Sequence, residues 1–264
     1  MKRPWCIHTV VYNEPLWWPI WRRYYSRWFE PQDIYVNHVI KPRRTWFDDH
    51  LVGDCWRHGH ELIPFYESER LDFALNTSRI NTRVRELLER YEQVITCEID
   101  EFLVSPVGLG PYLSAWDGNV GLASGYEVVH HFRPYKRSGV PQDPEPAIAW
   151  NKPLLAQRAW WYRSLLYSKP VITTIPITYR DGLHTCVEAE SARYTSDLLL
   201  LHLSKIDWDL AIERRKARIG QREPTDNHSF FGDELAQWWF TTVDSGTPLP
   251  VGYEAIPEWV QLAL

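Results

Sequence analysis

Three acidic residues stand within four positions directly after an apolar, β-branched stretch. Residues 93–97 predict a buried strand that runs straight into Glu98, Asp100 and Glu101. Carboxylates this close together repel one another unless a positive charge lies beside them. A divalent cation is the simplest compensation, because Mg²⁺ and Mn²⁺ take oxygen ligands and often bridge carboxylates to substrate phosphates. We therefore expect a metal site at this strand end, with a solvated loop as the alternative.

Histidine side chains could complete such a site. His184 follows an expected strand and His202 lies in a strongly apolar stretch, and either imidazole could join carboxylates around Mn²⁺. For each of them a hydrogen-bonded, buried histidine is the alternative. Cys55, His58 and His60 also form a C-x-x-H-x-H group, but no fourth ligand stands at a usual zinc spacing.

Two carboxylates, Glu127 and Asp181, are candidates for a general base. Such a base must come within hydrogen-bond reach of the group that it deprotonates. The spacing of the sequence singles out neither residue. Both therefore enter as hypotheses.

Aromatic residues are abundant, with 15 Trp, 14 Tyr and 9 Phe. Sugar-binding surfaces use such rings, because the C–H faces of a pyranose stack on them. Trp150, Trp160 and Trp161 could form an acceptor platform of this kind, with core packing as the alternative. Most of the other rings, in particular those at helical spacing in residues 17–28, predict a buried helix stripe.

Composition excludes several classes of protein. The chain has 264 residues, 44% of them hydrophobic and 24% charged, as in ordinary globular proteins. Its net charge of −5 gives no basic field for nucleic acid, and its four cysteines lie far apart, as expected for reduced thiols in the cytoplasm. No signal peptide and no apolar stretch of roughly 18 residues is present, so we expect no membrane span.

Strands and helices alternate along the first hundred residues. We expect strands at 5–12, 34–36, 61–66 and 93–97, and helices at 17–28 and 71–91. In the second half we expect strands at 121–131 and 169–179, a long loop at 134–153 and a helix at 204–218. This order predicts an α/β fold with a mostly parallel sheet flanked by helices, which places ligands at the carboxyl ends of its strands. We expect one domain, 1–264.

The order of these features resembles the family 2 type glycosyltransferases of the GT-A fold, in particular a bacterial subgroup without a membrane span. The likeness rests on Tyr12-Asn13-Glu14 after the first strand and on Glu98-Ile99-Asp100 after the fourth, which look like that family's opening loop and its D-x-D metal motif. Three further matching segments are residues 167–170, 182–184 and 201–207. The resemblance spans roughly residues 5–215 and implies a GT-A-like, Rossmann-like fold.

Carried over, the resemblance implies a nucleotide-binding half, residues 1–105, and an acceptor-binding half, residues 106–264. Tyr12, Asn13, Glu14, Asn37 and Glu98 would contact the nucleotide. Mn²⁺ or Mg²⁺ would be held by ligands from the set Asp100, Glu98, His184 and His202. The chain departs from the family at three places. Glu98 stands at the first Asp of the metal motif, Asn37 stands in place of a base-reading Asp, and residues 157–161 lack the Arg at the fourth position of the Q-x-x-R-W element.

The resemblance thus implies a metal-dependent transferase acting in the cytoplasm, with the inner face of the membrane as a second expected location. It would move a sugar from a nucleotide-sugar, with UDP-sugars the first expectation, to a glycan or lipid-linked acceptor, with inversion. Contact with the membrane, if any, would be peripheral, and nucleic acid is not an expected partner. Two alternatives remain: a non-catalytic carbohydrate-binding protein on the same fold, and a metal-dependent hydrolase of phosphorylated sugars.

Overall fold

The computed structural model describes residues 2–67, 72–130, 135–137, 140–142, 145–219 and 253–264. The chain divides into two compact units. The first unit comprises Met1–Gly125 and Ser164–Leu201, and the second comprises Tyr126–Arg163 and His202–Leu264. The expected division of roles at residue 105 stays a prediction.

The first unit is built on a largely parallel sheet. Its parallel strands lie in the order β4 (Tyr91–Thr96), β1 (Arg3–Val11), β2 (Ile34–Ile40) and β3 (Glu61–Tyr66). The other edge of β4 pairs with the antiparallel strand β10 (Pro170–Thr173). In turn, β10 pairs with the start of β6 (Val120–Val129). The sheet also includes β5 (Glu101–Val104), which pairs with β11 (Ala192–Lys205). The predicted α/β class, with a mixed, largely parallel sheet, is confirmed.

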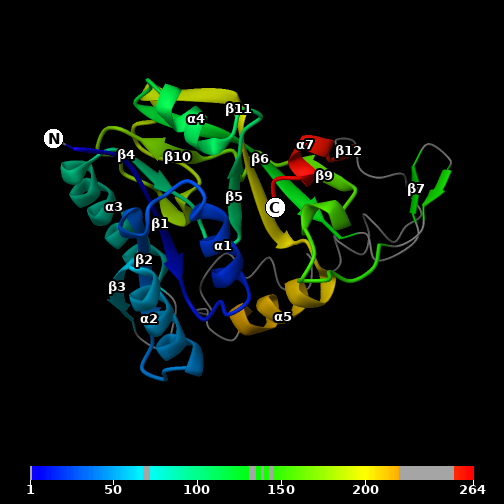
Figure 1. Cartoon of the computed structure of the whole chain (residues 1–264), viewed down its shortest axis with the longest axis horizontal. Coiled ribbons are helices and arrows are strands. Elements are labelled where there is room, and N and C mark those ends of the chain that lie inside the picture. The colour runs from blue at the N-terminus through cyan, green and yellow to red at the C-terminus, as the bar shows by residue number, and fades with distance from the viewer. Residues whose placement is uncertain (1, 68–71, 131–134, 138–139, 143–144, 220–252) are drawn as a thin grey trace. The chain divides into compact units, whose positions relative to one another are not determined.

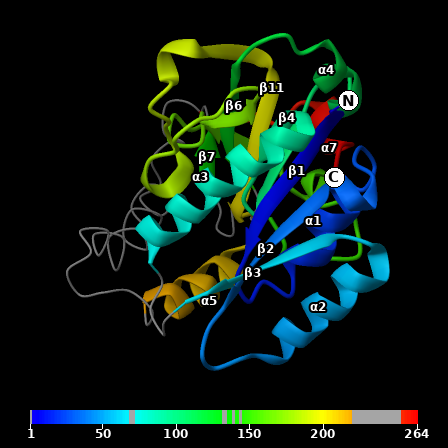
Figure 2. The same cartoon turned by 90° about the vertical axis from the view of Figure 1, so that its left-hand side faces the viewer.

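Helices cover this sheet because each carries one apolar face. The helices of the first unit are α1 (Trp17–Tyr25), α2 (Trp46–His58), α3 (Phe73–Arg90) and α4 (Leu109–Ala115), with short 3₁₀ turns at Pro31–Asp33, Asp181–Leu183 and Ala189–Ser191. Figure 1 shows α3 on one side of β1 and β2 and α1 on the other. Figure 2 shows α2 alongside β3.

The predicted helix stripes form the core of the first unit. In α3, Ile80, Val84 and Leu87 are buried in a cluster with Cys6 of β1 and Val94 of β4. In α1, the aromatic side chains Trp17, Trp18, Trp21, Tyr24 and Tyr25 are all buried. The helix ends at Tyr25, so the last ring of the predicted stripe, Trp28, follows the helix and is only half-buried.

The second unit is smaller and less regular. The end of β6 pairs with β9 (Trp160–Arg163), which pairs in turn with β12 (Tyr253–Ala255). The hairpin strands β7 (Tyr135–Arg137) and β8 (Val140–Gln142) lie within the predicted loop at 134–153. The described part of this unit also contains a 3₁₀ turn (Leu155–Gln157), α5 (Trp208–Ile219) and α7 (Glu258–Gln261). His131, the last residue of the strand predicted at 121–131, lies outside the described residues.

Several predicted boundaries are wrong for identifiable reasons. The helix expected from residue 204 begins at Trp208, because Ser204 and Lys205 continue β11 and the Asp207 carboxylate accepts a hydrogen bond from Leu210 N (3.2 Å), as a helix cap does. The strand expected to reach Tyr179 ends at Thr173.

Several elements were not predicted, among them α4, β9 and β11 as well as α2 and β5. The helix α2 hides its apolar periodicity among charged and histidine residues, and β5 begins inside the acidic cluster.

No helix among the described residues combines the length and the apolar character that crossing a bilayer requires.

Candidate functional site

The candidate site of the first unit lies where the strand order changes direction. From β1 the chain proceeds to β2 and β3 on one side, whereas β4 pairs with the other side of β1. The parallel register aligns His8 of β1 with Thr96 of β4, so both strands end at the same edge of the sheet. In open α/β sheets this topological switch point is where ligands bind. The sequence-predicted residues Tyr12–Glu14 and Glu98–Asp100 follow these two strands directly.

A lysine distant in sequence provides positive charge for the acidic loop. Lys169 Nζ lies 2.6 Å from Glu101 Oε1 and 3.5 Å from Glu98 Oε2. Burial would lower the pKa of the Lys169 ammonium, but the two carboxylates outweigh burial and raise it, so the group stays charged. The other Glu101 oxygen, Oε2, accepts a hydrogen bond from Glu98 N (2.8 Å). Glu101 thus connects the lysine to the backbone of the loop.

Close backbone packing holds the segment that carries Lys169. Ala123 N donates to Lys169 O (3.2 Å), and Gly125 N donates to Ser168 Oγ (3.0 Å). A Cβ atom on Gly125 would lie 2.2 Å from the backbone carbon of Tyr167, so this position requires glycine. The sequence offered no direct signal for Lys169, because it lies about seventy residues after the acids that it neutralises.

The two carboxylates predicted to bind metal differ in exposure. The Glu98 side chain is 41% exposed, whereas Asp100 is buried, with only 3% of its surface exposed. Among the described residues no three His, Cys, Asp or Glu side chains gather in a way that could hold a metal ion. A cation held by protein ligands alone therefore does not fit. Mg²⁺ commonly takes only one or two carboxylates together with substrate phosphates, which is the number that Glu98 and Asp100 would supply.

The loop after β1 has an unusual backbone. Asn13 adopts a left-handed conformation with φ of 45°, which Asn tolerates better than most residues. Its neighbour Tyr12 is half-buried, with the Lys41 ammonium 4.6 Å from the centre of its ring. Glu14 is half-buried, and its carbonyl accepts a hydrogen bond from Trp18 N (3.0 Å) as α1 begins. The exposed Asn13 side chain is thus carried on a turn that two neighbours anchor.

Asn37 lies inside the sheet. It is fully buried on β2, and its Nδ2 donates to Thr9 O (2.9 Å) and lies 3.2 Å from His8 Nδ1. The other nitrogen of His8 lies 2.8 Å from Thr96 Oγ1. Burial, with a smaller contribution from Arg83, lowers the pKa of His8 to about 3, so this imidazole is neutral. The predicted nucleotide contact would require Asn37 to leave these bonds.

His184 lies in a tight turn of the first unit. Its Nδ1 is 2.8 Å from Leu166 O, to which it donates, and its ring meets that of Tyr167 edge-on at 5.8 Å. The preceding Gly182 has φ of +73°, and a Cβ there would lie 2.8 Å from the His184 ring. The contacts of His184 therefore account for a structural role. The side chain of Asp181 lies outside the described ones.

In the second unit the structure brings together Glu127 and His202, which the sequence predicted for different roles. Glu127 Oε1 lies 2.7 Å from His202 Nδ1 and accepts from Ser204 Oγ (3.1 Å). Its Oε2 accepts from Lys205 Nζ (2.9 Å) and from Tyr162 Oη (3.2 Å). We call these five residues the Glu127 cluster. Sequence reasoning missed its last three members, although Ser204 and Lys205 stand in a segment that carried the family resemblance.

The Glu127 carboxylate is held in its charged form. It is 1% exposed, and burial alone would raise its pKa, but Lys205 and His202 lower the pKa to about 2. A carboxylate with so low a pKa is a weak base near neutral pH. His202 was predicted as a metal ligand, and its contact with Glu127 occupies one of its two ring nitrogens. The cluster therefore suits positioning or proton exchange through His202 better than direct deprotonation by Glu127.

The three tryptophans predicted to bind acceptor have different surroundings. Trp161 is buried and stacks on Tyr126. Their ring centroids lie 4.1 Å apart, and the angle between the ring planes is 25°. Trp160 is half-buried and packs against Val129, and Trp150 is also half-buried. Core packing thus accounts for Trp161, whereas Trp150 and Trp160 keep part of their surface exposed.

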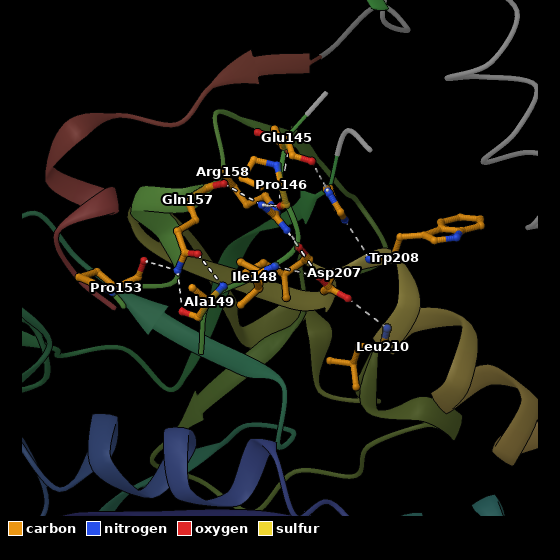
Figure 3. Close-up of polar contacts among 12 residues, drawn as sticks. Glu145, Pro146, Ile148, Ala149, Pro153, Gln157, Arg158, Asp207, Trp208 and Leu210 are labelled. Carbon is orange, nitrogen blue, oxygen red and sulfur yellow. Dashed lines mark hydrogen bonds and ion pairs between the residues drawn. The ribbon is translucent and has the colours of Figure 1, made fainter. Parts of the chain in front are cut away.

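The side chains of Gln157 and Arg158 form hydrogen bonds with backbone groups of the second unit. Arg158 is buried and donates from Nε to Ile206 O (2.6 Å) and from Nη1 to Pro146 O (3.0 Å). Gln157 both accepts from Ala149 N (2.8 Å) and donates to Ala149 O (3.0 Å). Figure 3 shows Arg158 pointing toward Asp207 and Gln157 turned toward Ala149. Both residues line an open hollow of about 540 Å³.

No model of a known protein family matches the chain, and no curated protein matches it.

Proposed function

We propose that this protein is a glycosyltransferase that uses a nucleotide-sugar and has a GT-A-like fold. The observation that carries the proposal is the arrangement at the switch point of the first unit, where the loop at Tyr12–Glu14 and the acidic loop at Glu98–Asp100 follow neighbouring parallel strands. This edge is where an α/β sheet binds a nucleotide, and the order of its motifs resembles that of the family 2 transferases.

The acidic loop is proposed to act at the diphosphate of the donor. Glu98 and Asp100 would hold Mn²⁺ or Mg²⁺ jointly with the donor phosphates, and a bound cation there would offset the charge that develops on the leaving group. Lys169 and Glu101 fix the backbone from which Glu98 projects. Tyr12, Asn13 and Glu14 would contact the nucleotide from the neighbouring strand end.

In the transfer itself, the bond from the anomeric carbon to the donor phosphate breaks, and the diphosphate leaves with the electron pair. The acceptor hydroxyl forms the new bond to that carbon with inversion and loses its proton to a base. The Glu127 cluster is one candidate, with His202 as its proton-accepting group, and Asp181 is the other. The proposed acceptor is a glycan or a lipid-linked sugar in the cytoplasm, with the inner membrane face as the second proposed location.

A thermal-shift panel tests the proposal. UDP, GDP, CDP and dTDP are each added with Mn²⁺, with Mg²⁺ or with EDTA, because a ligand that binds the native state raises the unfolding midpoint. We expect one nucleotide to raise the midpoint with a cation and to lose the effect in EDTA. Asp100→Asn should abolish this shift, whereas Asp117→Asn, which changes an exposed acid paired with Arg193, should retain it.

Three outcomes would contradict the proposal. No shift with any nucleotide would remove it and favour a carbohydrate-binding protein, which a glycan array then examines. A shift that survives both EDTA and Asp100→Asn would remove the metal from the proposal. Hydrolysis of a nucleotide-sugar with no transfer to any acceptor in a panel of glycans and lipid-linked sugars would favour the hydrolase.

A further inference from the structure

Two tryptophans of the first unit lie on its surface. Trp46 is 68% exposed and Trp56 is 86% exposed, and both belong to α2. Trp17, Trp18 and Trp21 of α1 show the usual behaviour of this residue, because all three are buried in the core. Large exposed rings gathered on one element are informative, since an apolar surface of this kind marks a site of interaction.

The two rings share one face of α2. The opposite face packs inward through Phe47, Leu51 and Cys55, which are buried. The exposed positions of the helix are Trp46, Asp49, His50, Val52, Trp56 and Arg57. At about 1.5 Å rise per residue, the two tryptophan positions lie roughly 15 Å apart along the helix axis. The exposed surface is therefore a long, convex strip with an aromatic ring near each end.

The charged residues on this strip are mostly positive. Arg43 and Arg44 are exposed directly before the helix, and Arg57 is exposed in its last turn. Asp49 is the exposed acid of the strip, and it pairs with Arg44 at 2.7 Å. The other two acids of the helix are buried. Asp48 pairs with His38, and Asp54 pairs with both Arg22 (3.1 Å) and Arg57 (3.7 Å). The exposed formal charge is thus 3 − 1 = +2, in a chain whose net charge is −5.

We propose that this strip, which we call the α2 face (Arg43, Arg44, Trp46, Val52, Trp56 and Arg57), binds the surface of an anionic lipid bilayer. Tryptophan rings favour the membrane–water interface, where their apolar bodies and polar N–H groups are both accommodated. Arginines beside them are attracted by anionic headgroups. A helix with an aromatic and cationic strip lies in the plane of that interface. The inference does not depend on the proposed transfer reaction.

Other occupants fit the strip less well. A sugar platform needs polar side chains at hydrogen-bond distance around a ring, whereas the two rings here stand far apart on a convex helix. A second copy of the chain would have to accommodate the same excess of positive charge facing itself, which is unfavourable. The charge complementarity favours anionic lipid, and both other occupants are outcomes of the test.

Vesicle co-sedimentation of the full chain tests the proposal. Vesicles of phosphatidylcholine alone are compared with vesicles that contain phosphatidylserine, at low and at high salt. We expect binding to the anionic vesicles, weakened by salt because the headgroup attraction is screened. The double variant Trp46→Ser with Trp56→Ser should reduce the partition coefficient about tenfold or more, given the apolar surface that each ring buries.

A matched control uses exposed apolar residues elsewhere in the first unit. Leu165→Ser with Val187→Ser removes two exposed side chains away from α2 and should leave vesicle binding unchanged. Thermal unfolding of all variants checks that folding is preserved.

Several results would overturn the proposal. These are absence of binding to anionic vesicles by the parent chain, equal binding by the tryptophan double variant, or equal loss in the leucine–valine control. If the double variant instead converts a dimer into a monomer in light scattering, or loses binding on a glycan array while vesicle binding is absent, the strip serves a second copy or a sugar.

Discussion

The acidic loop of the first unit and the Glu127 cluster of the second combine the same kinds of group in opposite proportions. In the acidic loop, the carboxylates of Glu98 and Glu101 share one buried ammonium, Lys169, and Glu98 stays partly exposed. In the Glu127 cluster, one buried carboxylate receives an ammonium, an imidazole and two hydroxyls.

The difference indicates which of the two regions can take up a cationic ligand. A loop with surplus negative charge gains from an added cation, whereas a carboxylate that already has four partners does not. Residue types alone made both Glu98 and Glu127 candidates for chemistry. Their partners distinguish the two residues.

The largest effect is expected from removing the ammonium of the acidic loop. Lys169→Met leaves the buried Glu101 carboxylate without its countercharge, and breaking a buried pair in this way costs about 3–5 kcal/mol. Urea unfolding measures the loss of stability. The control Arg193→Met breaks the exposed pair with Asp117 and should cost less than about 1 kcal/mol. Equal effects of the two variants would show that Lys169 does not stabilise the loop.

The Glu127 cluster should make the stability of the protein depend on pH in the acidic range. The folded pKa of about 2 lies below the ordinary value of 4.5, so the ionised carboxylate stabilises the fold above pH 4.5, and this stabilisation disappears as the pH falls toward 2. At pH 7 the unfolding free energy of the parent chain should be roughly 3 kcal/mol higher than that of Glu127→Gln. The measurement is the unfolding free energy of both proteins from pH 2 to pH 7, and a difference that does not shrink in acid contradicts this account.

The first unit should respond to acid at a higher pH, through His8. Its folded pKa of about 3 lies below the ordinary 6.5, so the unfolded chain binds a proton that the native state excludes. Stability is therefore complete above pH 6.5 and falls below it by up to about 1.4 kcal/mol per pH unit. In His8→Gln the slope between pH 6.5 and 4 should be smaller by this amount, and the remainder comes from His38, His60 and His130, whose pKa values burial also lowers. If the parent and the variant show parallel pH curves, His8 is not neutral in the native state.

The smallest effect concerns the loop after β1. Asn13→Ala places a Cβ-bearing residue without a compensating polar group in the left-handed region and should cost about 1 kcal/mol. Asn13→Gly, the matched control, should stay within about 0.5 kcal/mol of the parent. If the side chain contacts the nucleotide, both variants should weaken the thermal shift by the same amount. A loss in the alanine variant alone would mean that only the backbone matters.

Elements with strong periodicity could be predicted from the sequence. The span 61–66 matches β3 as found, and the pattern at Ile80, Val84 and Leu87 located α3, because local spacing alone determines which face of a helix is apolar. The helix α2 was missed because its inward face includes Asp48 and Asp54, whose burial depends on distant partners.

The site was predictable only in part, for the same reason. The positions of Tyr12–Glu14 and Glu98–Asp100 after strands follow from the local pattern. The countercharge of the acidic loop does not, because Lys169 approaches it through the pairing of β10 with β4. Nor could the sequence show that Glu127 meets His202, since that contact depends on long-range strand pairing. The local charge predicted a metal ion, but it could not show that an ammonium lies beside the same carboxylates.

The path of the chain through β6 and β11 constrains how this protein can be modified. Each strand begins in one unit and ends in the other, so neither unit is a continuous stretch of sequence. No single cut of the gene releases either unit, and exchanging one with a relative requires several junctions, two of them inside strands. Recombination and truncation libraries should therefore keep the two units together and not divide the chain between them.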